Sequence, residues 1–167
     1  MRWREFAESC PEFAGPIRER FEREQIFLLG TVRPDGSPRI SGVECDFVSD
    51  DLMTGMIWRS TKALDLLRDQ RMTIHSLVPD KAHESESQGD IKLYGRAVEI
   101  TDPDQRRRYE DAIEARIDWR PPEPYHCFAV DIDRVGLVRF AEEGRHVWSW
   151  HAGGELHKRV APVPPTG

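Results

Sequence analysis

Short apolar segments separated by turn-forming residues recur along most of this chain, and they constrain its fold more than any other feature. The first segment, 26–32, leads into 33–38 (RPDGSP), where proline, aspartate and glycine stand in an order that favours a tight turn. The other predicted strands cover 39–48, 52–58, 72–78, 91–100, 128–140 and 146–150. Six or seven strands joined mostly by turns indicate an antiparallel sheet curled into a barrel, because a parallel sheet would need regularly alternating helices.

Helical periodicity is confined to two or three segments placed between these strands. Phe13, Ile17 and Phe21 recur four residues apart among charged residues, which predicts an amphipathic helix over 12–24. The other predicted helices cover 61–70 and 103–117. We expect a mainly β protein with an N-terminal helical segment over 1–24, a barrel domain over 25–160 that includes an exposed polar loop at 79–89, and a flexible proline-rich tail over 161–167.

Length and composition exclude several classes of protein. A chain of 167 residues suits one domain with a sizeable core, and no run of 18 apolar residues exists that could form a transmembrane helix. The net charge of −6 argues against a nucleic-acid partner. Cys10, Cys45 and Cys127 form no Cys-x-x-Cys pair, the histidines lack metal-binding spacing, and no secretion signal opens the chain. We therefore expect a cytoplasmic protein with buried free thiols and no metal site.

The segment Arg59-Ser60-Thr61-Lys62 carries the clearest chemistry, because it lies where a predicted strand passes into a predicted helix. The first N–H groups of a helix lack intrahelical partners, and the helix dipole attracts anions to them. Two hydroxyls and two cations add to those donors, which suits a phosphate group. The commoner alternative is a helix capped by Ser60 and flanked by two solvated cations.

The order of these motifs resembles the pyridoxamine 5′-phosphate oxidase-like, FMN-binding split-barrel family. The motifs that carry the resemblance are 31–38 (TVRPDGSP), 60–66 (STKALDL) followed by Arg71, and 94–97 (YGRA). They span most of the region from residue 25 to residue 160. The resemblance implies a Greek-key split barrel that forms a homodimer, with two cofactors bound at the subunit interface and each site using both chains.

By this resemblance, Ser60 and Lys62 match the serine and lysine that hold the flavin phosphate. Thr61 stands where the family commonly has arginine, and Arg59 is our candidate to replace that guanidinium. The strand positions that match those beside the flavin are Gly42, Val43, Glu44, Gly55, Met56 and Ile57. Lys92 shares a strand face with Asp90 and Tyr94, and we interpret it either as a group that approaches the flavin or as an outward-facing lysine.

The C-terminal segment 148–159 (WSWHAGGELHKR) resembles the end of true pyridoxamine phosphate oxidases. Trp150 and Arg159 match flavin-contacting residues there, and His157 matches a substrate-contacting histidine. Glu155 stands where those enzymes carry the arginine that holds the substrate phosphate, and a carboxylate would repel that group. We therefore expect no vitamin-B6 oxidase activity, and a chance match to a common Gly-Gly hairpin is the alternative explanation of the segment.

The leading hypothesis is an FMN-dependent oxidoreductase of unknown substrate, with no identifiable catalytic acid or base. A reductase that uses the deazaflavin coenzyme F-420 is an alternative. Arg18, Arg20 and Arg23 would then bind its polyglutamate tail, although a solvated helix face explains them equally well. Two hypotheses without catalysis stay open as well: a flavin- or heme-binding stress protein, and a structural domain that holds no cofactor.

Overall fold

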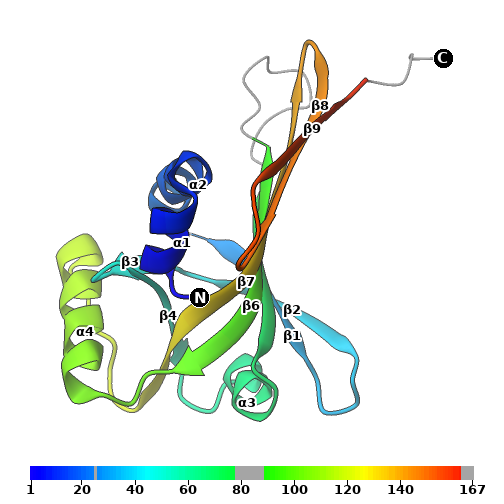
Figure 1. Cartoon of the computed structure of the whole chain (residues 1–167). Coiled ribbons are helices and arrows are strands. Elements are labelled where there is room, and N and C mark those ends of the chain that lie inside the picture. Colours follow the sequence, from blue (N-terminus) through cyan, green and yellow to red (C-terminus); the bar gives the residue numbers. More distant parts are fainter. Residues whose placement is uncertain (25, 78–88, 163–167) are drawn as a thin grey trace.

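The computed structural model describes residues 1–24, 26–77 and 89–162, and in these ranges four helices surround one antiparallel sheet of nine strands (Figure 1). The helices are α1 (Trp3–Ser9), α2 (Pro11–Arg23), α3 (Thr61–Arg68) and α4 (Pro103–Ile117). The strands are β1 (Phe27–Val32), β2 (Pro38–Val43), β3 (Asp46–Val48), β4 (Asp51–Ile57), β5 (Arg71–Ser76), β6 (Asp90–Glu99), β7 (Tyr125–Ala141), β8 (Gly144–His151) and β9 (His157–Ala161).

The strands follow the order β2-β1-β5-β6-β7-β4-β3, and β8 and β9 continue from β7. The long strand β7 pairs with β4 over 125–129, with β6 over 128–138 and, in its second half, with β8 over 134–141. This second half carries β8 and β9 away from the body of the sheet as a projecting arm (Figure 1). The predicted mainly β, antiparallel fold is confirmed.

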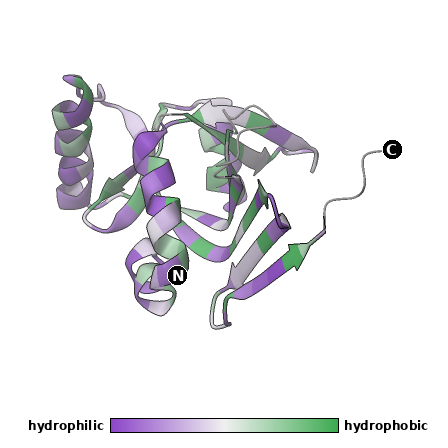
Figure 2. Cartoon of the chain, turned by 90° about the horizontal axis from the view of Figure 1, so that it is seen from above, coloured by the Kyte–Doolittle hydropathy of each residue, from purple (hydrophilic) through white to green (hydrophobic). Residues whose placement is uncertain are grey.

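Alternating side chains bury one face of the sheet. Hydrophobic and hydrophilic residues alternate along the strands (Figure 2), and alternate residues of β1 and of most of β6 are buried. The larger core cluster joins this face to both N-terminal helices and includes Trp3, Phe13, Ile17, Leu29 and Leu93. A smaller cluster lies between α4 and the strands β3, β4 and β7, and includes Tyr109, Ile113, Tyr125 and Cys127.

The structure departs from the predicted elements where tertiary contacts decide the outcome. The predicted strand 39–48 is two strands, because β2 pairs with β1 whereas β3 pairs with β4. Helix α1 and strand β9 were not predicted, so the structure has more strands and helices than expected. Most of the predicted loop 79–89 and most of the predicted tail 161–167 lie outside the described residues.

The three cysteines are free and buried, as predicted. Burial raises the pKa of the Cys127 thiol to about 12, and it raises that of the Cys45 thiol still further above its ordinary value. These thiols therefore stay protonated at neutral pH. Among the described residues, no helix combines the length and the apolar character needed to cross a membrane.

Candidate functional site

A cavity of about 740 Å³ opens between strands β2 and β4 on one side and helix α4 with the segment after it on the other. Its size falls in the range of small-molecule sites. Seven predicted site residues line it: Gly42, Val43, Glu44, Gly55, Met56, Ile57 and Lys62. Residues predicted to lie on two strands and one helix therefore line one cavity.

The anchor end, which we define as residues 57–62, is the junction of β4 and α3. Ile57, Trp58 and Lys62 line the cavity, whereas the three residues between Trp58 and Lys62 adjoin it without lining it. Arg59 has a φ of 54°, in the left-handed region that is unfavourable for residues other than glycine. Ser60 occupies the N-cap position of α3, but its side chain makes no capping hydrogen bond, contrary to the capping alternative. Its Oγ is buried and has no hydrogen-bond partner among the described residues. The junction therefore holds a hydroxyl that α3 itself does not use.

Lys62 brings a cation to the same end of the cavity. Its Nζ donates a hydrogen bond to the carbonyl oxygen of Gly42 on β2, at 2.8 Å. Burial lowers the pKa of this ammonium group. No carboxylate of the described residues lies within ion-pairing distance of Lys62, and an ammonium group has three donors. An anion bound at the N-terminus of α3 would satisfy the remaining donors and offset the cost of burial.

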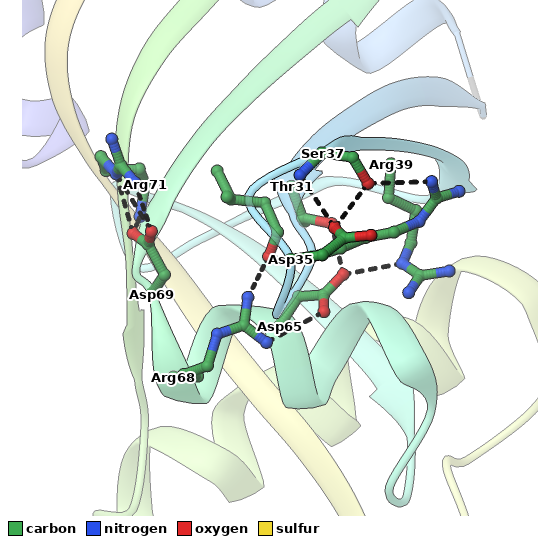
Figure 3. Close-up of polar contacts among 10 residues, drawn as sticks. Thr31, Asp35, Ser37, Arg39, Asp65, Arg68, Asp69 and Arg71 are labelled. Atoms are coloured by element: carbon green, nitrogen blue, oxygen red, sulfur yellow. Dashed lines mark hydrogen bonds and ion pairs between the residues drawn. The ribbon is translucent and has the colours of Figure 1, made fainter.

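A buried carboxylate fixes α3 against the hairpin of β1 and β2 (Figure 3). Asp65, 2% exposed, accepts hydrogen bonds from Thr31 Oγ1 at 3.0 Å, from Arg39 Nε at 2.7 Å and from Arg68 Nη1 at 3.4 Å. Arg68 also donates to the carbonyl oxygen of Val32. Burial alone would raise the pKa of Asp65, but the hydrogen bonds from Arg39 and Thr31 outweigh it and lower that pKa. The anchor end is thus held by charge-assisted bonds one turn further along α3.

Two glycines shape the strand side of the cavity in different ways. A Cβ on Gly55 would lie 2.6 Å from the Oη of Tyr109, so this position must lack a side chain for α4 to pack on β4. A Cβ on Gly42 would meet only Ile26 Cγ2, at 3.8 Å, which is ordinary contact. The chain's own packing does not require glycine at position 42, and the bare backbone there faces the cavity.

The opposite side of the cavity is an apolar wall that the sequence did not reveal. We define the apolar wall as Ile113, Ile117, Trp119, Pro121, Pro122 and Pro124. Tyr109, Tyr125, Trp58 and Ile26 complete the lining. The sequence 119–124 (WRPPEP) places a tryptophan beside clustered prolines, and such a tryptophan, when exposed, is a signal for a binding surface.

Trp58 lies at the rim of the cavity on a buried histidine. The two rings stack with centroids 4.5 Å apart and planes at 13°. Nδ1 of His126 lies 2.9 Å from Oε1 of Glu99, which fixes the imidazole beneath the indole. The other face of Trp58 is available to a ligand, because the residue is half exposed.

Outside the anchor end, four predicted site residues lie away from this cavity within the chain. Lys92 contacts Asp90 on β6, so the outward-facing interpretation fits it better than a flavin contact from the same chain. Trp150 is buried in the core with its ring centroid 4.7 Å from that of Phe6. His157 and Arg159 are exposed on β9, in the projecting arm (Figure 1). The predicted grouping of these residues with the anchor end is therefore not formed inside one chain, because β7 carries the arm away.

Comparisons with known proteins agree with this architecture. The sequence model of the pyridoxamine 5′-phosphate oxidase family matches residues 14–139. No curated protein sequence matches the chain. A pyridoxamine 5′-phosphate oxidase-related, FMN-binding protein from Nostoc punctiforme has a similar structure, with a TM-score of 0.63 and 16% identity over 92% of this chain and 96% of that one.

Two further solved structures share the fold but differ in the molecules they bind. A heme-binding protein from Mycobacterium smegmatis has a TM-score of 0.58 and 16% identity, and the match covers 87% of this chain but only 56% of that one. PhzG from Burkholderia lata, solved with tetrahydrophenazine-1-carboxylic acid, has a TM-score of 0.58 and 10% identity over 92% of this chain and 89% of that one. At these identities the likeness establishes the split-barrel fold alone.

Proposed function

Because this chain belongs to the pyridoxamine 5′-phosphate oxidase family, we propose that it binds FMN in the cavity and acts as a flavin-dependent oxidoreductase on a small molecule. The proposal rests mainly on polar groups at the anchor end whose hydrogen bonds are not all made within the described residues. The Ser60 hydroxyl is buried without a partner among the described residues, and the Lys62 ammonium has no carboxylate partner there. A phosphate supplies acceptors for both groups and for the first N–H groups of α3.

The residues of the cavity fit a flavin in shape as well as in charge. Lys62 in the cavity lining and Ser60 at the N-cap of α3 hold the phosphate, and the bare backbone at Gly42 allows the cofactor to lie against β2. Arg59, which precedes the anchor serine, is our candidate for a second cation on the phosphate, in place of the arginine that Thr61 replaces. Bound FMN supplies the transfer of a hydride or of single electrons. The apolar wall gives the same space an apolar surface, from which a bound ligand would displace water.

A phosphorylated vitamin-B6 substrate does not suit this cavity. Lys62 is the one cation among its described lining residues, and the cofactor phosphate takes it. Glu155 is exposed in the turn before β9, so it offers no partner to a second phosphate. We therefore propose an oxidoreductase that is not a pyridoxamine phosphate oxidase.

We further propose that the chain works as a homodimer with the cofactor sites near the interface. Large apolar side chains are exposed close to the anchor end, with Ile57 81% and Leu64 41% exposed, and a second copy would cover them. The projecting arm would then bring His157 and Arg159 to the partner's cavity, which accounts for their distance from the cavity of their own chain. Trp150 has no such role, because Phe6 covers its ring in the core.

Two alternative cofactors, F-420 and heme, fit the described residues less well than FMN. Arg18 pairs with Glu22, and Arg20 is buried in a pair with Glu24, so these arginines are committed elsewhere than to a polyglutamate tail. The solvated helix face proposed for them is wrong for Arg20, which is 2% exposed. The described lining of the cavity contains neither histidine nor cysteine to ligate a heme iron. FMN is therefore the cofactor we favour over F-420 and heme.

Titration of the purified protein with FMN, followed by flavin fluorescence, tests the proposal. We expect Lys62→Ala to weaken FMN binding roughly 10- to 100-fold, because a hydrogen bond from a charged group contributes about 1.5–3 kcal/mol. Ser60→Ala should weaken it less. Arg4→Ala is the control, since Arg4 is also a cation with a hydrogen-bonded partner, Asp50, but lies on α1 outside the cavity. Equal affinity of wild type and Lys62→Ala, or preference for F-420 or heme in competition, would overturn the proposal.

A further inference from the structure

The apolar wall lines the same cavity as the anchor end, but its side chains carry none of the charged or hydroxyl groups found there. Trp119 is 52% exposed and Ile117 is 42% exposed, although both line a concave surface. Their indole and aliphatic groups, with three proline rings beside them, present flat apolar faces. Exposed apolar side chains around a cavity of this volume mark a ligand surface more than a packing defect.

The polar groups next to the wall are already satisfied inside the protein. The Tyr125 hydroxyl donates to Oε1 of Glu110 at 2.9 Å. The Glu44 carboxylate, which also lines the cavity, accepts a hydrogen bond from Arg116 at 2.8 Å. A ligand on the wall therefore finds no unpaired cation among the described lining residues besides Lys62, which lies at the anchor end. An anionic ligand would lose its hydration there without gaining a partner.

Ion pairs on the far side of the wall hold it in place before any ligand arrives. Arg120 pairs with Glu110 at 2.7 Å, with Glu114 at 2.8 Å and with Asp111. Arg106 donates to Glu123 at 2.7 Å and stacks over the Tyr125 ring at 4.1 Å. These bonds tie the segment after α4 back onto the helix. A preformed wall lowers the entropy cost of binding.

We propose that the apolar wall is the substrate subsite and that it selects planar, apolar molecules without a net negative charge. The proposal rests on the proposed function, because the substrate must lie in the cavity beside the flavin. Trp119 is the specificity-determining residue, since it is the largest exposed side chain of the wall. Carboxylates, sulfonates and phosphates of the same shape are disfavoured because the wall carries no cation. Arg159 of the partner subunit, which the proposed dimer brings to the cavity, is assigned to the flavin.

A matched pair of probes tests the subsite: 2-naphthamide, which is neutral, and 2-naphthoate, which has nearly the same shape and a negative charge. Equilibrium dialysis against FMN-loaded protein measures the affinity of each. We expect 2-naphthoate to bind at least about tenfold more weakly than 2-naphthamide. Trp119→Ala should weaken 2-naphthamide binding about tenfold and leave FMN affinity unchanged. Phe140→Ala is the control, because Phe140 is 56% exposed but lies outside the cavity.

Equal binding of the two probes, or unchanged 2-naphthamide binding by Trp119→Ala and by Trp119→Phe, would overturn the subsite. A dimer that dissociates in the Trp119 variants would also overturn it, because the wall would then be a contact between two copies of the chain. Wild-type protein that binds no FMN but still prefers 2-naphthamide through Trp119 would support the subsite and refute the proposed cofactor alone. The two proposals therefore fail in distinguishable ways.

Discussion

The two ends of the cavity are built by different means. The anchor end is one continuous stretch, residues 57–62, and Asp65 on the same helix fixes it through two arginines and a threonine. The apolar wall comes from α4 and the segment after it, and it meets β4 through the close approach of Tyr109 to Gly55. The anchor end is fixed by a buried carboxylate, whereas the wall is positioned by the fit of Tyr109 on Gly55 and by ion pairs of Arg120 that reach solvent. Substitutions that remove one kind of contact should therefore damage one end and spare the other.

Asp65→Ala should break the anchor end with the largest effect. It removes a 2% exposed carboxylate and leaves Arg39 and Arg68 without their partner. We expect the free energy of unfolding to fall by about 3 kcal/mol. This is near the lower end of the loss seen when one partner of a buried ion pair is removed, because both arginines reach solvent. Urea unfolding measures this loss, and FMN affinity should fall with it. Asp69→Ala is the control, since the pair of Asp69 with Arg71 is exposed; an equal loss in both variants would show that Asp65 has no special role.

Gly55→Ala should damage the wall and spare the anchor. The added Cβ would lie 2.6 Å from Tyr109 Oη, so α4 must shift on β4. We expect a loss of about 2 kcal/mol in the free energy of unfolding, as for overpacking elsewhere. Tyr109→Phe in the same chain removes the clashing oxygen and should restore part of the loss. Gly42→Ala is the contrast: it should leave unfolding unchanged, because the nearest atom is 3.8 Å away, and it should weaken FMN binding.

The difference between the two ends also explains what could be predicted from the sequence. The anchor end is local: a strand, a serine and a lysine at fixed spacing are visible in residues 52–70 alone. The bounds of α4 were predicted for the same reason, since Asp102 caps the helix through the N–H of Gln105. Helix periodicity likewise identified α2.

The apolar wall has no local signature, because its position depends on contacts between distant residues. Ion pairs of Arg120 and Arg106 bring the proline-rich segment to the cavity. The spacing of residues in the sequence predicts neither these ion pairs nor the close approach of Tyr109 to Gly55. The surroundings of Trp150 likewise could not be predicted from its motif. Its ring is taken by Phe6 from α1, a helix that the periodicity did not reveal. Local motifs predicted the polar groups of the anchor end, whereas the shape of the cavity could not be predicted without the fold.

The acid dependence of stability gives the smallest and most selective test of the anchor end. The pKa of Asp65 is lowered in the folded protein, so its contribution is fully present above the unfolded pKa, about 4, and is lost as the pH falls through the folded pKa. The difference in unfolding free energy between wild type and Asp65→Asn should therefore be constant above about pH 5 and shrink below about pH 4. Urea unfolding of both proteins at a series of pH values measures it. A difference that persists unchanged to pH 3 would mean that α3 depends on the shape of residue 65 and not on its charge, and a buried charge would then no longer distinguish the anchor end from the wall.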